Sequence, residues 1–202
     1  TIDDTPSHYD AAYYGDRQTA AALNNGNGTA GIGQAILNSY AQPVYLISAA
    51  ESYFLQAEAS QRGWITGNSE TLFNDGITAS FEQLGVFANG IGADSAAEAY
   101  YTQGKPLADW SATPANQKIE AIIVQKWASA AITDQYEQWV EYRRTGFPAT
   151  DILPLSKYPG NSMHIPNRYM FPKSESQSNQ GAYNKAVATG NDPQNSKVFW
   201  MK

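Results

Sequence analysis

The sequence contains no cysteine, which excludes a disulfide framework, a thiolate metal site and a cysteine nucleophile. It has only two histidines, His8 and His164, and neither lies in an H-E-x-x-H pattern; no G-x-S-x-G elbow occurs either. No apolar run approaches the roughly 20 residues that a membrane-spanning helix needs. We therefore predict that the chain uses no metal and no cofactor, and that it is not an enzyme.

Charged side chains are also scarce. They make up 16% of the sequence, and 13 basic residues against 19 acidic ones give a net charge of −6, whereas a typical protein is about one quarter charged. Nucleic acids are bound by clustered lysine and arginine, and the sequence has no such cluster. It therefore predicts no nucleic-acid partner, and the abundance of Asn, Gln, Ser, Thr and Tyr favours a location outside the cytoplasm.

Apolar and aromatic residues are plentiful enough to form a core. Hydrophobic residues are 42% of the chain, which includes 5 Trp, 13 Tyr and 7 Phe. A disordered chain would lack this content. The 202 residues fit one or two domains of roughly 100–200 residues each.

We expect residues 1–43, which are rich in Gly and Asn, to form an irregular segment. Its stretch from Gly26 to Gly31 matches G-x-G-x-x-G. A dinucleotide site would require a strand before this motif and a helix after it, and an Ala/Asn stretch and another glycine stand there instead. We interpret the motif as a surface loop.

Residues 44–147 form a core of helical hairpins. Apolar residues recur at helical spacing, and cap residues and glycines mark the ends of each segment. Short connections between consecutive helices predict antiparallel pairs. The expected helices run from Val44 to Gly63, from Asn68 or Ser69 to Gly85, from a Ser95 capping box to Gln103, from Thr113 with Pro114 onward, and from Asp134 to Gly146. The predicted fold is all-α, with stacked, tetratricopeptide-like hairpins and long irregular loops.

Residues 148–202 form a proline-rich tail. Six of the ten prolines lie there and no apolar periodicity continues. A segment this long is unusual for an ordinary loop. Apolar residues such as Ile165, Phe171 and Trp200 punctuate it, so we expect the tail to wrap the same domain as irregular ordered structure.

Loop aromatics offer a candidate ligand site. Trp110 lies in the loop after the third helix, and Tyr100 and Tyr101 lie at the end of that helix. Aromatic rings stack on sugars while nearby amides, here represented by Asn89, satisfy hydroxyls. The alternative is that these rings fold onto the core, which is the role we predict for Trp64, Trp127 and Trp139.

Carboxylate pairs occur on single helix faces, as in Glu51 with Glu58 and Glu137 with Glu141. A glycosidase needs two carboxyl groups that converge from opposite sides of a bond, so these pairs do not indicate catalysis. Glu58 lies among alanines on a packed helix face and would need a cation there. Arg143 or Arg144 could supply it, and we predict that Arg143 pairs with Glu58.

Several blocks of the sequence together resemble the SusD/RagB family of outer-membrane lipoproteins of Bacteroidetes. The similar blocks are Tyr53–Ala59 with Arg62–Trp64, Leu72–Ser80, Ile123–Trp127, Glu137–Pro148, Ile165–Arg168 with Phe171, Pro172 and Glu175, and Asn184 with Lys197–Trp200. They occur in the family's order from about Val44 to the last residues. Because family members are typically much longer, the chain resembles their C-terminal portion, and the lipidated cysteine that anchors them is missing.

The resemblance implies a function without chemistry. Members of the family bind glycans at the cell surface and deliver them to a SusC-like TonB-dependent transporter, on which they act as a lid. We therefore expect surface exposure at the outer membrane, an oligosaccharide or polysaccharide ligand, and membrane attachment only through the absent lipid anchor. A peptide-binding member of the same family and a tetratricopeptide-like protein–protein scaffold are the alternatives. The matching blocks are scaffold residues, so the resemblance assigns no binding residue.

Overall fold

The computed structural model describes residues 40–41, 44–86, 92–131, 133–149, 165–188 and 196–201. Regular structure in these residues is helical, and no strand occurs among them. The elements are α2 (Ala49–Gln61), α3 (Ser69–Gln83), α4 (Ala93–Tyr101), the 3₁₀ helix η2 (Ala115–Gln117), α5 (Lys118–Ala130), α6 (Gln135–Thr145), α7 (Lys173–Ser178) and α8 (Gln180–Ala188). The all-α prediction is confirmed.

The chain divides into two compact units. The first, the helical core unit, comprises Ile32–Tyr142 and Gly146–Ala149, and the second includes Arg143–Thr145 and Thr150–Lys202. The second unit contains α7 and α8, where the sequence analysis expected no regular element; Phe171 packs edge-on against Tyr183 of α8 there, with ring centroids 5.9 Å apart. The predicted boundaries at residues 43 and 147, and the wrapping of the tail, stay predictions.

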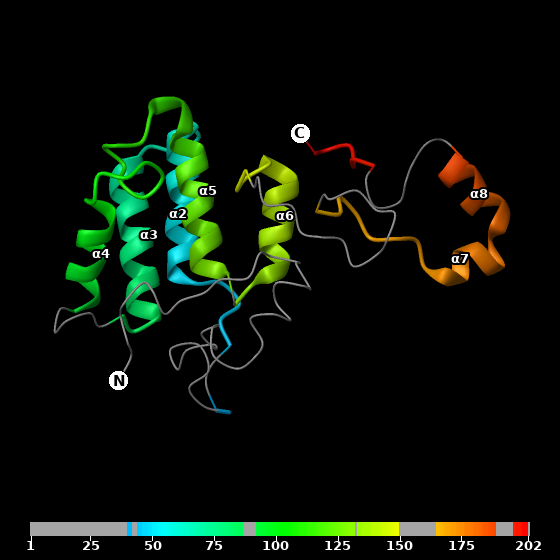
Figure 1. The fold of residues 1–202 in the computed structure, drawn as a ribbon, viewed down its shortest axis with the longest axis horizontal. Coiled ribbons are helices and arrows are strands. Elements are labelled where there is room, and N and C mark those ends of the chain that lie inside the picture. The colour runs from blue at the N-terminus through cyan, green and yellow to red at the C-terminus, as the bar shows by residue number, and fades with distance from the viewer. Residues whose placement is uncertain are drawn as a thin grey trace, which may run out of the picture. The chain divides into compact units, whose positions relative to one another are not determined.

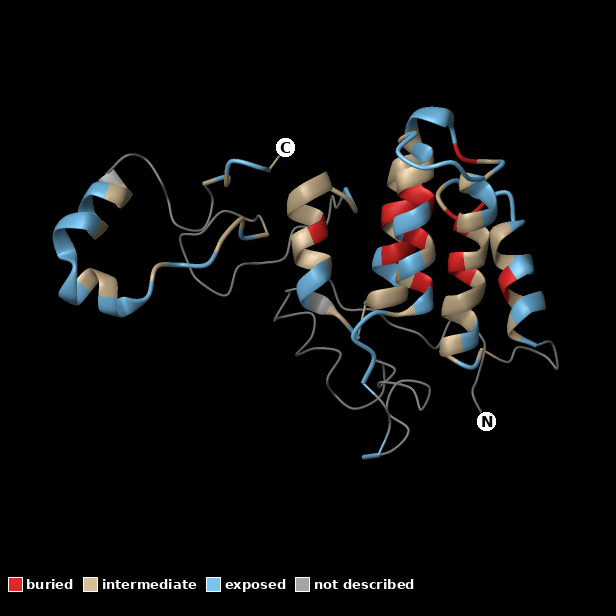
Figure 2. Cartoon of the chain, turned by 180° about the vertical axis from the view of Figure 1, so that it is seen from behind, coloured by how far each residue is buried: buried red, intermediate tan, exposed pale blue. Residues whose placement is uncertain are grey.

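The helical core unit is built around the α2–α3 hairpin. In Figure 1, α3 lies between α4 and the pair α2 and α5, and it contacts all three helices. Figure 2 shows that buried residues concentrate on α2, α3 and α5. Among the described residues, the largest fully buried side chains are those of Phe54, Phe73, Ile77, Ile122 and Ile123. The core therefore lies where the predicted apolar stripes of these helices meet.

Cap residues explain where most of these helices begin. The Asn68 side chain accepts hydrogen bonds from the backbone N–H of Glu70 and Thr71, and Asp134 accepts one from Glu137, which confirms both predicted starts. Ser48 caps α2 by accepting from the N–H of Glu51 at 3.0 Å. The first helix therefore begins at Ala49, not at Val44.

Two predicted caps are wrong. Helix α4 begins at Ala93 after Gly92, so Ser95 lies inside its first turn and forms no capping box. Thr113 does not cap the helix after it: its hydroxyl oxygen accepts the N–H of Leu107 at 2.9 Å, and the residue at the N-cap of η2 is Pro114. Pro114 precedes the short 3₁₀ helix η2, which leads into α5.

A buried ion pair links α5 to α6. Lys126 Nζ lies 2.8 Å from Glu141 Oε2, and both side chains are about one-tenth exposed or less. Gln138 Nε2 also donates to the Trp127 carbonyl at 2.7 Å. Because a single buried charge is costly without its partner, the Lys126–Glu141 pair fixes how α6 follows α5.

Candidate functional site

A pocket of about 220 Å³ opens between α3, α4 and α5 of the helical core unit. Its lining combines apolar rings with hydroxyl and amide groups, the usual composition of a small-ligand site. The residues that line it are Phe54, Ile77, Ser80, Phe81, Leu84, Tyr100, Gln125, Ala128 and Ser129. We refer to it as the α3–α5 pocket. It has room for about one sugar ring rather than for an extended chain.

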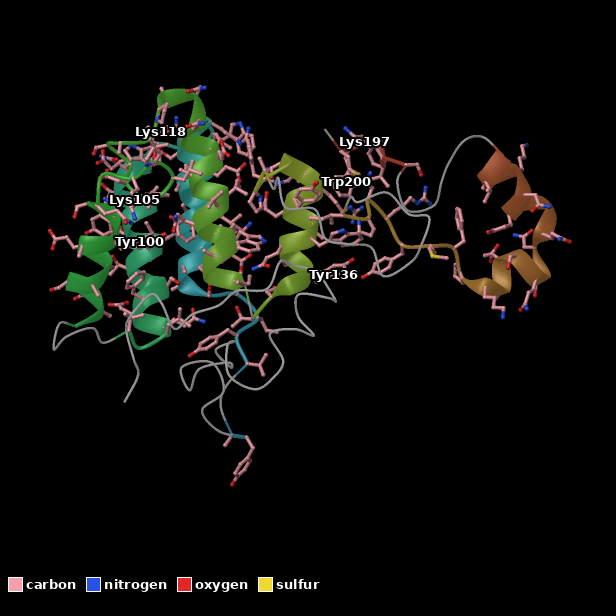
Figure 3. All side chains as sticks on the ribbon, viewed as in Figure 1. Tyr100, Lys105, Lys118, Tyr136, Lys197 and Trp200 are labelled. Atoms are coloured by element: carbon pink, nitrogen blue, oxygen red, sulfur yellow. The ribbon has the colours of Figure 1, made fainter. Side chains whose placement is uncertain are left out.

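Two aromatic rings form one wall of the α3–α5 pocket. Phe81 of α3 and Tyr100 of α4 have ring centroids 5.5 Å apart and planes tilted by 45°. Figure 3 labels Tyr100 on α4, where its side chain lies beside α3. Both rings are only partly buried. They can therefore offer an apolar surface to the C–H face of a sugar.

Gln125 supplies the amide of the pocket. Its Nε2 donates to the Leu107 carbonyl at 2.8 Å and lies 3.2 Å from the Tyr100 hydroxyl, which in turn lies 3.3 Å from Gln125 Oε1. The amide is buried, and these contacts hold its orientation. These contacts use both Nε2 hydrogens, so the amide can offer a ligand hydroxyl the second lone pair of Oε1, in a fixed position.

The loop that holds Gln125 is itself strained and cross-braced. Leu107 has φ = +68°, a left-handed conformation that bulky residues avoid at a cost of about 1–2 kcal/mol. Its N–H donates to Thr113 Oγ1 at 2.9 Å, and Thr113 donates in turn to the carbonyl of Asp109. The strained conformation directs the Leu107 carbonyl to Gln125.

Asp109 organises this loop through its carboxylate. Oδ1 accepts from the N–H and the hydroxyl of Ser111 at 2.8 and 2.7 Å, and Oδ2 accepts from the N–H of Gly104 at 2.9 Å. The hydrogen bond from the Ser111 hydroxyl, aided by backbone N–H groups and opposed by partial burial, lowers the pKa of Asp109 below its ordinary value. The ionised carboxylate therefore holds the loop closed.

Trp110 is packed within the fold. Its ring lies 5.2 Å from Phe73 between centroids, and Lys118 Nζ lies 4.3 Å from its centroid while donating to the Trp110 carbonyl. Desolvation lowers the pKa of Lys118, an effect that Glu70 and Asp109 oppose. Figure 3 labels Lys118 at the start of α5. Trp110 thus contacts the core, and its role in ligand binding stays a prediction.

Neither Tyr101 nor Asn89 is assigned to the α3–α5 pocket by the described structure. Tyr101 packs against the core cluster, and burial first, then the nearby Glu98, Asp75 and Asp94, raise its pKa. It is not among the residues that line the pocket. Asn89 lies outside the described residues. Of the four predicted ligand residues, Tyr100 is the one that the described structure places in the pocket.

Two tryptophans expected in the core are exposed. Trp64 is 69% exposed and Trp127 is 40% exposed, so that prediction is wrong for both. Trp64 follows Gly63, whose φ of +74° ends α2 and turns the chain away from it. Near Trp127, α6 contacts α5 through the hydrogen bond from Gln138 to the Trp127 carbonyl and through the Lys126–Glu141 ion pair. Trp139 is partly buried and lies 5.8 Å from Tyr136 between ring centroids.

Glu58 is buried, as expected, and has a cation beside it. Arg62, one helical turn later, places Nη2 2.7 Å and Nε 2.8 Å from Glu58 Oε1. The sequence analysis assigned Arg143 to this role and overlooked Arg62, although the i, i+4 spacing could have indicated it. The pairing of Glu58 with Arg143 stays a prediction.

Most residues that line the α3–α5 pocket were not predicted from the sequence. Gln125, Phe81, Ser80 and Ser129 were not proposed. Gln125 could have been recognised from the sequence, because it is an amide near the apolar residues Ile122 and Ile123 on a predicted buried helix face. A buried polar group needs a partner, so its position indicates a polar contact. The hydroxyls of Ser80 and Ser129 carried none, since serine is common on helices of every kind.

Other kinds of site have little support in the described part of the chain. No group of three or more His, Cys, Asp or Glu side chains that could hold a metal ion occurs in those residues. None of the described helices is both long and apolar enough to cross a membrane. The predictions of no metal, no cofactor and no catalysis stay predictions.

A family model matches most of the chain. The model of a SusD-like family, described as starch-binding and associating with the outer membrane, matches residues 3–172. No protein with a curated functional description matches.

Solved structures of SusD-like proteins are similar to the chain. A SusD homologue from Bacteroides fragilis NCTC 9343 is 27% identical with a TM-score of 0.61, covering 97% of this chain and 43% of its own. A SusD-like protein of Bacteroidetes AC2a is 26% identical with a TM-score of 0.58, covering 76% and 30%. A chitin-binding protein is 29% identical with a TM-score of 0.56, covering 76% and 32%. The chain therefore spans less than half the length of these relatives.

Proposed function

The chain belongs to the SusD-like family, and we propose that it binds a neutral oligosaccharide in the α3–α5 pocket without altering it chemically. The observation that carries this proposal is the pocket itself, in which the rings of Phe81 and Tyr100 stand beside the fixed amide of Gln125. Rings provide stacking area and the amide and serine hydroxyls provide hydrogen bonds. Sugar recognition requires both kinds of contact.

The ligand class follows from the charge and size of the pocket. Its lining contains no charged side chain, so it offers nothing to pair with a phosphate, a carboxylate or an ammonium group. The family model is described as starch-binding, and one similar structure is a chitin-binding protein. A neutral hexose or N-acetylhexosamine unit fits both the chemistry and the volume of about 220 Å³.

We further propose that the bound glycan is delivered to a SusC-like TonB-dependent transporter at the cell surface. Support comes from the family description, which associates its members with the outer membrane. Purification of the protein from outer membranes of its own cell tests this step. A large β-barrel should copurify, whereas copurification of soluble proteins alone would favour a tetratricopeptide-like scaffold instead.

Calorimetric titration tests the ligand class. Maltoheptaose, chitohexaose and a tryptic peptide mixture from casein would each be titrated into the purified chain. We expect heat from at least one of the two saccharides, with a dissociation constant near the micromolar range (about −8 kcal/mol), and none from the peptides. Heat from the peptides alone would replace the proposal with peptide capture. No heat from any of the three would contradict small-ligand binding altogether.

A further inference from the structure

Trp64 lies on a rigid turn at the C-terminal end of α2. Its N–H donates to the Ala59 carbonyl at 2.9 Å, and the N–H of Gly63 donates to the Ser60 carbonyl at 2.9 Å. Gly63 adopts φ = +74°, so this is a Schellman-type helix end. The Ser60 hydroxyl also donates to the Gly67 carbonyl at 3.0 Å, which braces the rest of the connection to α3. The backbone that carries Trp64 is therefore fixed.

One side of the Trp64 indole is occupied by an anchored cation. The Arg62 guanidinium lies over the ring, with Cζ 5.3 Å from the ring centroid. Arg62 is in turn held by the buried Glu58 carboxylate, at 2.7 Å. A cation over an aromatic face attracts the ring and limits its rotation. The indole is 69% exposed, and the Arg62 contact holds its orientation.

The surroundings of Trp64 indicate what could stack on it. Gln61, Thr66 and Asn68, which lie within four residues of it in the chain, are exposed, neutral and polar. Asn68 uses its carbonyl oxygen to cap α3, which leaves its Nδ2 group able to donate. The Arg62 charge is already matched by Glu58. An exposed apolar ring with neutral polar side chains close to it in the sequence suits a pyranose, which has C–H groups on one face and hydroxyls around its rim.

We propose that Trp64 is a second sugar-stacking site, which takes one neutral pyranose unit of a polysaccharide. This inference rests on the proposed glycan-binding function, and it gives a binding role to Trp64, which the family resemblance placed among scaffold residues but which is exposed. The α3–α5 pocket lies toward the C-terminal end of α3, whereas Trp64 precedes its N-terminal end, and the rise along α3 from Ser69 to Phe81 is about 18 Å. One long glycan chain could occupy both. The second contact would then be intramolecular and would raise affinity for polysaccharides without changing affinity for short oligosaccharides.

Nuclear magnetic resonance observes Trp64 directly. In ¹⁵N-labelled chain, the indole N–H signal of Trp64 is assigned by its loss in Trp64→Phe. Maltotriose and chitotriose are then titrated into the unaltered chain and into Ala128→Phe, in which a phenylalanine at an exposed position of the pocket wall blocks the α3–α5 pocket. We expect at least one saccharide to shift the Trp64 signal in both proteins, and the Trp110 signal, packed between Phe73 and Lys118, to stay in place.

Binding to a polymer measures the consequence. In affinity electrophoresis through gels containing amylopectin or glycol chitin, we expect Trp64→Ala to weaken binding at least tenfold. Trp127→Ala, which removes another exposed tryptophan of the same unit, should weaken it less than twofold. The dissociation constant of Trp64→Ala for the trisaccharide that binds the pocket should change less than twofold, because the pocket is intact.

The outcomes separate this inference from the proposed function. A Trp64 signal that stays in place while the unaltered chain binds a saccharide overturns the second site and leaves the pocket proposal standing. A Trp64 signal that shifts while Ala128→Phe binds as the unaltered chain does supports the second site and overturns the pocket. If no saccharide gives a shift or heat, both are overturned.

Discussion

At the scale of single residues, a few buried polar groups decide the geometry of the candidate site. Gln125 is oriented by the Leu107 carbonyl, and Leu107 holds its strained φ because the loop around Asp109 is closed by hydrogen bonds. Strain of this kind persists only where surrounding contacts enforce it. Asp109 is therefore tied to the pocket through Leu107 and Gln125, although it does not line the pocket.

Replacing Asp109 by Asn should open this loop. An amide NH₂ would face backbone N–H groups in place of a carboxylate oxygen, so we expect Asp109→Asn to lower the free energy of unfolding by about 1–3 kcal/mol at pH 7. Urea unfolding followed by circular dichroism measures this. Asp94→Asn, at an exposed position of α4, is the control and should change stability by less than about 0.5 kcal/mol.

The effect of Asp109→Asn should depend on pH in a defined direction. The folded state lowers the pKa of Asp109, so its carboxylate stabilises the fold above the unfolded value of about 3.9, and this contribution is lost as pH falls through the folded pKa. The difference between the unaltered chain and Asp109→Asn should therefore shrink in acid. A difference that stays constant from pH 7 to pH 3 would show that the ionised form is not what holds the loop.

At the scale of elements, the sequence predicted which helices exist better than it predicted their ends. Local sequence signals predicted three helix ends correctly: the starts of α3 at Asn68 and of α6 at Asp134, and the end of α6 at Gly146. The apparent caps at Ser95 and Thr113 failed because both residues were judged from sequence spacing alone, while Thr113 is engaged by the preceding loop. The prediction that Trp64 packs in the core was wrong for a related reason. Its hydrophobicity does not reveal that Gly63, in a left-handed conformation, turns the side chain outward.

The contact between α2 and α3 depends on Gly76. A Cβ placed there would lie 2.7 Å from Cε1 of Phe54, which is buried and packs edge-on against Phe73. Alanine favours a helix over glycine by about 1 kcal/mol, but overpacking costs about 1–3 kcal/mol and should outweigh it here, because three carbons of the Phe54 ring would lie within 3.0 Å of the new Cβ. We expect Gly76→Ala to lower the unfolding free energy by about 1–2 kcal/mol.

Thermal and urea unfolding with two further variants would isolate this clash. Gly181→Ala in α8, where a Cβ would meet nothing within 4 Å, should be neutral or slightly stabilising. Adding Phe54→Leu to Gly76→Ala should recover part of the loss, since the smaller side chain leaves room for the methyl group. Full stability of Gly76→Ala by itself would mean that the two helices do not approach as closely as described.

At the scale of the whole molecule, the chain is a SusD-like segment that spans 30–43% of the related solved chains described above. Family membership could be predicted from the sequence because several blocks of scaffold residues occur in order. The α3–α5 pocket could not be predicted from the sequence, because residues from α2, α3, α4 and α5 line it and no local spacing relates them. Of its lining, the sequence analysis proposed Tyr100, from the general preference of sugars for aromatic rings.

The central claim, that the α3–α5 pocket binds a neutral glycan, is tested most directly by titrating maltoheptaose and chitohexaose into three proteins by calorimetry. These are the unaltered chain, Ala128→Phe and Ala99→Phe, the last a matched substitution at an exposed position of α4 that is not among the pocket-lining residues. The account predicts that the unaltered chain and Ala99→Phe bind the same saccharide equally, and that Ala128→Phe binds it at least tenfold more weakly. Equal binding by Ala128→Phe, or no binding of either saccharide by the unaltered chain, would contradict it.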